Sequence, residues 1–171
     1  MPASDQGVSK SKDRYKLIPR VLCFVTHGPD VLLLKGAPDK RLWANRYNGL
    51  GGHLERGEGA AAAAQREILE EAGLRVRALR LRGVVTIHTG EPDGIGLYVF
   101  TAEALSREFT PSPEGALAWV PAARVAEYDL VEDLFTLLPR VLAMRPEDPP
   151  FSASYTFDAH DRWLISFDAL P

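Results

Sequence analysis

The sequence has little cysteine and no long apolar run. Its single cysteine, Cys23, lies inside the apolar segment 21–25. One thiol excludes an internal disulfide, and its position predicts a small buried side chain. A catalytic thiol is the alternative, but no neighbouring residue in the sequence would lower its pKa. Because no stretch reaches about 18 apolar residues, a transmembrane helix is excluded.

Basic charge is not in excess either. The chain has 20 Lys and Arg against 23 Asp and Glu, a net charge of −3, whereas proteins that bind duplex nucleic acid normally carry a basic excess. The polar N-terminus lacks the apolar segment of a secretory signal. These absences predict a cytoplasmic protein with neither a nucleic-acid polymer nor a membrane as partner. They leave the oligomeric state open.

The length of 171 residues suggests one domain, which is long enough to bury a core without disulfides or metal staples. Residues 1–16 carry almost no apolar side chains and are predicted to be a disordered leader. Residues 17–171 are predicted to form a single domain, since they show neither an internal repeat nor a second linker.

The expected order of elements is β-β-α-β-β-β-α-β-β. Segments 17–26 and 31–35 predict a hairpin, and 59–72 predicts a helix that Gly73 ends. The spacing in 129–144 predicts a second helix, in which Pro139 predicts a kink or a break. Further strands are expected at 76–88, 95–102, 116–120, 151–157 and 162–167, the last two as a closing hairpin. This order implies an α/β (α+β) fold with a mixed sheet between helices.

Three carboxylates share one face of the first helix. Glu67, Glu70 and Glu71 stand at i, i+3 and i+4, which places neighbouring side chains within about 6 Å. Like charges at this spacing destabilise an isolated helix, and a hard cation such as Mg²⁺ would relieve the repulsion. Arg66 stands four residues before Glu70 and could hold that carboxylate from behind. A solvated acidic helix face is the alternative interpretation of this helix alone.

The residues around these carboxylates match a known motif. Gly52, five residues, Glu58, seven residues, Arg66-Glu67, an aliphatic residue, one residue, Glu70-Glu71, one residue and Gly73-Leu74 agree with the Nudix box at every fixed position. The segment 43–53 and the C-terminal half are also similar to the MutT-like branch, to which the oxidised-purine nucleoside triphosphatases belong. The chain therefore resembles the MutT-like Nudix hydrolases.

The resemblance implies an α/β/α sandwich that hydrolyses a nucleoside diphosphate linked to another group. It implies a Mg²⁺ site, with Mn²⁺ as a second option, whose ligands would be Glu67, Glu70, Glu71 and the Gly51 carbonyl. Glu67 or Glu71 would also activate the attacking water, while Glu58 and Arg66 would orient the site.

Outside the box the resemblance is looser. Asn48 would read the purine, although it could equally close the turn before Gly49. Asp133, fourteen residues after Trp119, would also contact the base. Glu114, five residues before Trp119, would lie near the metal, with a plain surface acid as the alternative.

The remaining substrate contacts are expected at His53 and Lys35. The chain departs from the relatives at His53, where they have a lysine, and at Val131, where they have a stacking tryptophan. Both departures leave the base preference open. Three residues of the loop before Asn48 could reach a base or anchor the loop, namely Arg41, Trp43 and Tyr47.

The sequence thus predicts a Mg²⁺-dependent hydrolase that converts a nucleoside triphosphate into a nucleoside monophosphate and pyrophosphate. Oxidised guanine triphosphates such as 8-oxo-dGTP are the first expected substrates. A Nudix hydrolase of ADP-ribose, nucleotide sugars or dinucleoside polyphosphates is the alternative enzyme. A non-catalytic Nudix-fold binding module is the alternative of another class, but such modules usually lose the box carboxylates that are present here.

Overall fold

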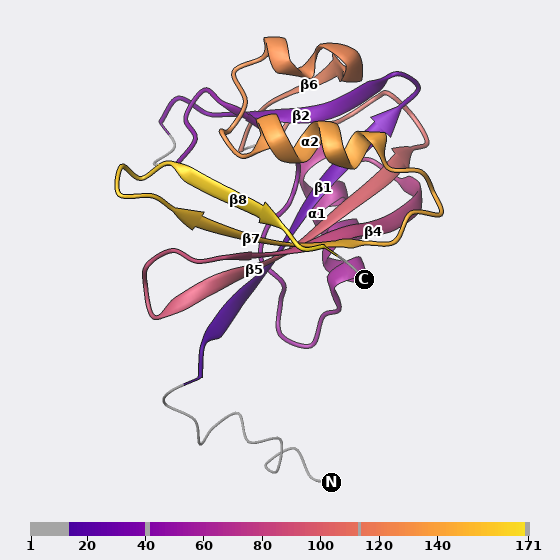
Figure 1. Ribbon diagram of the computed structural model, residues 1–171. Coiled ribbons are helices and arrows are strands. Elements are labelled where there is room, and N and C mark those ends of the chain that lie inside the picture. Colours follow the sequence, from indigo (N-terminus) through magenta and orange to yellow (C-terminus); the bar gives the residue numbers. More distant parts are fainter. Residues whose placement is uncertain (1–13, 40–41, 113, 170–171) are drawn as a thin grey trace, which may run out of the picture.

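The computed structural model describes residues 14–39, 42–112 and 114–169, which form an 8-stranded mixed sheet (Figure 1). The strands are β1 (Lys16–His27), β2 (Asp30–Gly36), β3 (Tyr47–Asn48), β4 (Val76–Ile87), β5 (Asp93–Ala104), β6 (Gly115–Pro121), β7 (Phe151–Phe157) and β8 (Trp163–Phe167). The helices are α1 (Ala60–Ala72), the 3-10 helix η3 (Ala122–Glu127) and α2 (Leu134–Ala143).

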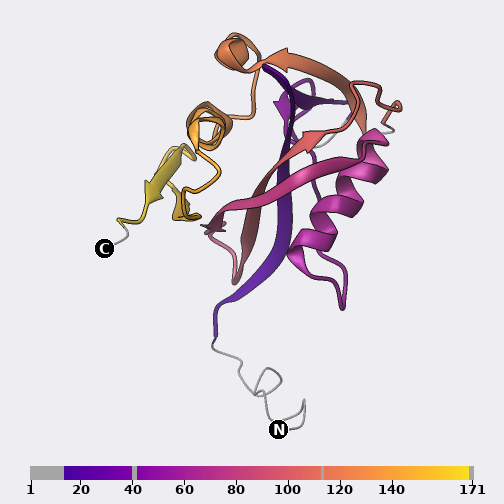
Figure 2. The same ribbon diagram turned by 90° about the vertical axis from the view of Figure 1, so that its right-hand side faces the viewer.

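The strands follow the order β3-β2-β1-β5-β4-β7-β8, and β6 pairs with β2. The pairs β1–β5 and β4–β7 are parallel, and the other pairs are antiparallel. The predicted mixed sheet between helices is therefore confirmed. Figure 2 shows α1 on one side of the sheet and α2 on the other.

Each face of the sheet has its own core because helices cover both. Along β1, Val21, Cys23 and Val25 pack toward α1, whereas Leu22 and Phe24 pack toward α2. A strand covered on both faces has no solvent side, which explains why its sequence is an unbroken apolar run. Cys23 is 1% exposed, so the predicted buried thiol is confirmed, and burial raises its pKa.

The helix α1 lies close to the sheet because its buried face is mostly alanine. Ala63, Ala64 and Ala72 are fully buried, and the Cys23 Sγ lies 4.0 Å from the Ala64 carbonyl oxygen. Gly73 ends the helix at φ 66°, a left-handed conformation that glycine adopts without steric cost. The predicted helix and its end are confirmed.

The second helix corrects the sequence prediction. It begins at Leu134 instead of near Asp129, and it runs through Pro139 without a break. Residues 129–131 instead pair with β3, where the Val131 amide donates to the Tyr47 carbonyl at 3.0 Å. The apolar face that α2 buries against the sheet holds the two halves of the helix together despite the missing proline N–H.

The predicted hairpins are confirmed at both ends of the described chain. β1 and β2 pair at Val25–Leu32, and β8 pairs along its whole length with residues 153–157 of β7. The first strand begins at Lys16, and Tyr15 stacks on His88 with the ring centroids 5.3 Å apart. The rest of the predicted leader, residues 1–13, lies outside the described residues. No helix in the described part is long and apolar enough to cross a membrane.

Candidate active site

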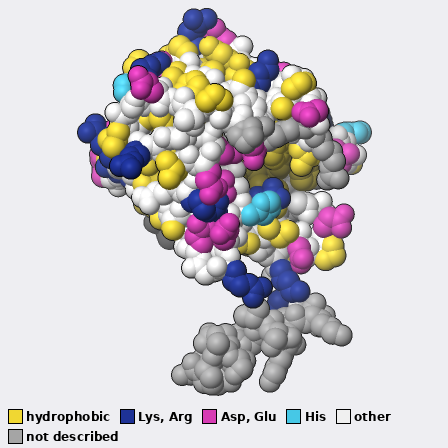
Figure 3. Space-filling model, turned by 180° about the vertical axis from the view of Figure 1, so that it is seen from behind, with side chains coloured by type: hydrophobic (Ala, Val, Ile, Leu, Met, Phe, Trp, Pro, Cys, Tyr) yellow, Lys and Arg dark blue, Asp and Glu magenta, His cyan; other side chains and the backbone are white. Residues whose placement is uncertain are grey.

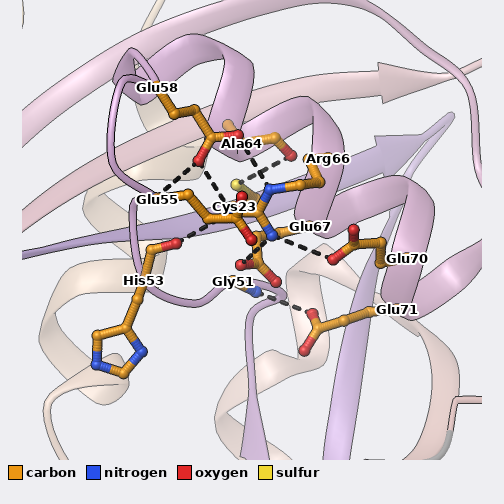
Figure 4. A network of polar contacts seen from close by, with 10 residues as sticks. All are labelled: Cys23, Gly51, His53, Glu55, Glu58, Ala64, Arg66, Glu67, Glu70 and Glu71. Carbon is orange, nitrogen blue, oxygen red and sulfur yellow. Dashed lines mark hydrogen bonds and ion pairs between the residues drawn. The ribbon is translucent and has the colours of Figure 1, made fainter.

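Arg66 organises the residues of the box (Figure 4). Its guanidinium donates to both carboxylate oxygens of Glu58, each at 3.0 Å, to Glu67 at 2.8 Å and to Glu70 at 3.1 Å. It also donates to the His53 carbonyl at 3.0 Å, which ties the loop before α1 to the helix. These contacts raise the pKa of Arg66, so the guanidinium stays charged.

Glu58 is held in its ionised form by this arrangement. The Arg66 guanidinium, together with the Glu55 backbone amide at 3.0 Å, keeps the pKa of Glu58 below its ordinary value. A fixed carboxylate that contacts both the loop and the helix suits the orienting role expected from the sequence.

Glu67 and Glu71 point from α1 toward the glycines that precede the helix. The Gly51 amide donates to Glu71 Oε2 at 2.9 Å, and a Cβ on Gly52 would overlap the Glu67 carboxylate. The missing side chain of Gly52 therefore lets the loop backbone approach Glu67, whereas that of Gly51 lets the loop approach β1, where a Cβ would overlap the Val21 carbonyl. Glu71 is only 6% exposed, whereas the Glu70 side chain is 59% exposed.

The carboxylates provide the oxygen donors that Mg²⁺ and Mn²⁺ prefer. Three of them, on Glu58, Glu67 and Glu70, converge on the single guanidinium of Arg66, so the network keeps net negative charge that a divalent cation would neutralise. In the described part of the chain, no three such side chains form a ready ligand set. Glu70, whose side chain is 59% exposed, has the most freedom among these three carboxylates to reorient toward a cation.

An open cleft of about 300 Å³ adjoins the carboxylates. Its polar lining includes Glu71, Glu114 and the backbone around Gly51. Its apolar lining includes Leu42 and Trp43 of the β2–β3 loop. Figure 3 shows acidic and basic side chains gathered near the middle of one face, beside a hollow with hydrophobic side chains.

Two of the sequence-predicted contacts line this cleft. Asn48 does so while its Oδ1 accepts from the Gly49 amide at 2.8 Å. The oxygen of Asn48 thus closes the turn, and its side-chain amide remains available as a donor. Glu114 is exposed, lines the cleft and directly precedes β6.

Asp133 lies elsewhere, in the core on the α2 side of the sheet. Its side chain is 8% exposed, and burial raises its pKa to about 6. Asp133 in turn raises the pKa of Tyr155, although burial of that phenol has the larger effect. Among the described residues, the Tyr155 hydroxyl is the buried side-chain polar atom that has no hydrogen-bond partner. Such an atom is costly unless water or a ligand reaches it.

The structure does not bring His53 and Lys35 into the cleft as it stands. The His53 ring accepts from Arg20 Nε at 3.1 Å and turns away from the carboxylates (Figure 4). The Lys35 ammonium lies 5.6 Å from the centroid of the Tyr47 ring. Neither residue is among those of the described chain that line the cleft.

Comparison with known proteins places the chain in a family. A model described as the NUDIX domain matches residues 16–141. The chain belongs to the Nudix family. A Mus musculus protein named "Oxidized purine nucleoside triphosphate hydrolase" is 31% identical over 102 residues, which cover 59% of this chain and 65% of that protein. A Danio rerio protein of the same name is 28% identical over 130 residues, which cover 75% and 81%.

A solved structure of similar fold is a MutT protein from Bacillus halodurans. It superposes with a TM-score of 0.75 at 24% identity and covers 91% of this chain and 100% of its own. This likeness confirms the fold of the Nudix domain. The mouse relative is matched over slightly less than two thirds of its length, so its activity is carried over to this chain only as a proposal.

The Nudix box accounts for Glu71 in the lining of the cleft but not for the lining residues of the β2–β3 loop. The sequence did not decide whether Trp43 contacts a base or anchors the loop. In the structure its side chain is 43% exposed and lines the cleft. Arg41 lies outside the described residues. Arg46, which sequence reasoning missed, lines the cleft and pairs with Glu132 at 2.6 Å. Its position two residues before Asn48, inside the segment that resembles the relatives, was the available signal.

Proposed function

We propose that this Nudix protein hydrolyses a nucleoside triphosphate to a nucleoside monophosphate and pyrophosphate with Mg²⁺, or with Mn²⁺ in its place. We further propose 8-oxo-dGTP as the preferred substrate. The names of the mouse and zebrafish relatives support the reaction. The fold, the intact box carboxylates and the cleft beside them support a small nucleotide as the partner.

The observation that carries the proposal is a cleft lined by both acidic and apolar side chains beside the box carboxylates. A nucleoside triphosphate is a polyanion at one end and a flat, largely apolar base at the other. The acidic lining and the Gly51 backbone suit the phosphates together with their counter-cation, and the side chains of Leu42 and Trp43 suit the base. A bound Mg²⁺ would neutralise phosphate charge and lower the pKa of a coordinated water.

The residues of the chain have separate tasks in this reaction. Water adds to a phosphorus in line with the departing oxygen, and its proton passes to a base, for which Glu67 and Glu71 are the candidates. Arg66 and Glu58 hold the helix and the loop in fixed relation, so that the carboxylates keep their positions. We expect this preorganisation to matter more than any single contact to the phosphates.

Base selection is proposed to depend on Asn48 and Asp133. Oxidation converts N7 of guanine from an acceptor to a donor, so a site that accepts from N7–H and donates to O6 favours the 8-oxo form. An ionised Asp133 could accept from N1–H and N2–H together, whereas adenine would present a lone pair at N1. A buried polar group left unpaired costs about 1–3 kcal/mol, which corresponds to roughly tenfold to hundredfold selectivity per contact.

Chelation tests the reaction class. Purified protein should release pyrophosphate from nucleoside triphosphates with Mg²⁺, lose this activity in EDTA, and recover it when Mg²⁺ is added back. Undiminished turnover after exhaustive chelation would contradict the proposal. A panel of canonical and oxidised triphosphates, ADP-ribose, nucleotide sugars and dinucleoside polyphosphates tests the substrate class.

The base preference is tested with variants of Asn48 and Asp133. We expect a higher kcat/KM for 8-oxo-dGTP than for dGTP, and Asn48→Ala should narrow this difference. Asn48→Asp is the matched control, because it keeps an acceptor for the Gly49 amide but removes the side-chain donor. Asp133→Ala should weaken all guanine substrates and leave metal affinity unchanged. Equal turnover of dGTP and 8-oxo-dGTP would refute the preference but not the Nudix chemistry.

A further inference from the structure

The two ends of the sheet differ in how their edges are protected. At one end, β3 is only two residues long and is covered by the segment 129–131, where the Tyr47 amide donates to the Asp129 carbonyl at 2.8 Å. At the other end, β8 pairs with β7 and with no other strand of the described residues. Figures 1 and 2 show β8 at the rim of the sheet, on the side of the molecule away from α1.

The register of the last hairpin shows which backbone groups of β8 point outward. The Asp158 amide donates to the Arg162 carbonyl, and the Asp168 amide donates to the Ser152 carbonyl, both at 2.9 Å. Hydrogen bonds to a neighbouring strand alternate along an antiparallel pair, so the even-numbered residues of β8 face β7. The N–H and C=O groups of the odd-numbered residues face away from the sheet, and these residues are Trp163, Ile165 and Phe167.

The sequence of β8 contains none of the features that usually protect an edge strand. Trp-Leu-Ile-Ser-Phe has no proline, no charged side chain and no glycine, and its pairing with β7 shows no bulge in the register. Leu164 is 52% exposed beside this edge. Edge strands of this kind readily pair with another strand.

We propose that β8 pairs antiparallel with β8 of a second copy of this chain, about a two-fold axis at Ile165. In this register Ile165 faces its own copy, and Trp163 faces Phe167 of the other copy. All three outward-facing residues of each strand then exchange their hydrogen bonds with the opposite strand.

The side chains favour this register as well. Leu164 faces Ser166 of the other copy, and Arg162 faces Asp168, so the pairing places opposite charges across the interface at both of its ends. Within its own copy Arg162 pairs with Asp158 at 2.7 Å, and Asp168 accepts from the Ser152 hydroxyl. Since the Arg162 side chain is 75% exposed, the contact with Asp168 of the other copy adds to these bonds. Moving the axis to Leu164 or to Ser166 leaves one outward-facing residue unpaired and separates Arg162 from Asp168. The strand is thus complementary to itself in one register.

Disulfide trapping reads this register directly. Leu164 and Ser166 face each other in positions that exchange no hydrogen bonds across the axis, where Cα atoms lie about 4.5 Å apart, within the range for a disulfide. The one native thiol is buried, so new cysteines react on a clean background. The variant Leu164→Cys/Ser166→Cys should form a covalent dimer under mild oxidation.

Two matched variants control this measurement. Leu105→Cys places an equally exposed thiol away from β8 and reports random collisions. Leu164→Cys alone should cross-link less than the double variant, because its partner in the proposed register is a serine. Efficient cross-linking by the single variant would place the axis at Leu164 and overturn the register that we propose.

The mass of the unmodified protein tests the association itself. Light scattering should give a mass that rises with concentration from 18.8 kDa toward twice this value. Ile165→Pro should stay monomeric, because it removes an outward N–H and no hydrogen bond to β7. Its hydrolytic activity should be unchanged, since β8 forms no part of the cleft, so a failure here is distinct from a failure of the proposed reaction.

A charge exchange separates pairing from simple misfolding. Asp168→Arg places two arginines opposite each other and should shift the equilibrium toward monomer, and the double variant Arg162→Asp/Asp168→Arg should restore the dimer. A constant monomer mass up to high concentration, with cross-linking no greater than for Leu105→Cys, would overturn the proposal. A dimer that all β8 variants leave unaffected would do the same, because its interface would lie elsewhere.

Discussion

The carboxylate network of the box and the cleft beside it are built in different ways. In the carboxylate network, Glu58, Arg66, Glu67, Glu70 and Glu71 come from one short stretch of chain, and Arg66 contacts three of the four acids. The cleft is lined by Trp43 and Asn48 of the β2–β3 region, by Glu71 of α1 and by Glu114, which precedes β6. The first is a local structure, and the second is assembled from distant segments.

This difference explains why the first region is easier to predict. Helical spacing alone places Glu67, Glu70 and Glu71 together, and the Arg66 guanidinium holds Glu58, Glu67 and Glu70. The second region depends on how far the β2–β3 loop folds over the sheet and on the pairing of residues 129–131 with β3. Arg46 lines the cleft beside the β2–β3 loop, and its guanidinium pairs with Glu132 in the segment before α2. It therefore links two segments that are distant in the sequence.

The largest expected effect on catalysis comes from the carboxylates of the box. Glu71→Gln keeps the size of the side chain and an acceptor for the Gly51 amide, but it removes the charge. We expect kcat to fall by at least ~100-fold, the scale for loss of a group that acts on transition-state charge, with an unchanged fold. Glu91→Gln, an exposed acid outside the box, is the control. Glu70→Gln should also lose at least ~100-fold in kcat, and full activity would assign Glu70 to a solvated helix face.

Asp133 should make stability depend on pH. Its folded-state pKa of about 6 lies above the ordinary 3.8, so ionisation is disfavoured in the folded protein. The free energy of unfolding should therefore fall as pH rises from about 4 to 6 and stay lower above that range. Asp133→Asn should remove this pH dependence, and its free energy of unfolding at pH 7.5 should exceed that of the parent protein by on the order of 2–3 kcal/mol. Denaturant unfolding across pH 4–8 checks it, and parallel curves for the two proteins would contradict it.

Arg66→Lys tests whether the network positions the acids. Lysine keeps the charge but cannot donate to Glu58, Glu67, Glu70 and the His53 carbonyl at once. Activity should fall by roughly 10-fold to 100-fold, and added Mg²⁺ should recover part of it, because looser ligands bind the metal more weakly. Arg77→Lys, in an exposed ion pair on β4, should behave as the parent protein. If both variants retain full activity, the network is structural only.

The smallest expected effect is on substrate affinity and comes from Trp43 in the lining of the cleft. Trp43→Ala removes an aromatic surface from the cleft and should raise KM by about 3-fold to 10-fold, from the ~0.5–1.5 kcal/mol of an aromatic contact, with little change in kcat. Trp43→Phe should recover most of the affinity. Binding of nucleotide in EDTA, measured by quenching of Trp43 fluorescence in a protein that carries Trp119→Phe and Trp163→Phe, checks the contact without hydrolysis.

Much of the fold could be predicted from local signals. The apolar run of β1, the alanine-rich helix with Gly73 at its end, and the closing hairpin lie where the sequence indicates. Of the kink or break predicted at Pro139, the break does not occur, because a proline breaks a helix only when packing does not outweigh the lost hydrogen bond. The start of α2 was missed because residues 129–131 satisfy their backbone groups against β3, a partner more than 80 residues away in the chain.

By itself, the sequence determined the family, the carboxylate face of α1 and the glycines that approach it. These features follow from fixed spacing along one helix and its preceding loop, so no distant contact can rearrange them. Only the tertiary structure decided that Trp43 and Arg46 share a cleft with Glu71 of the box, that Asp133 is buried and close enough to Tyr155 to raise its pKa, and that β8 is the last strand of the sheet in the described part of the chain. Each of these depends on which segments pack together, and packing is decided by the whole core instead of by any local pattern.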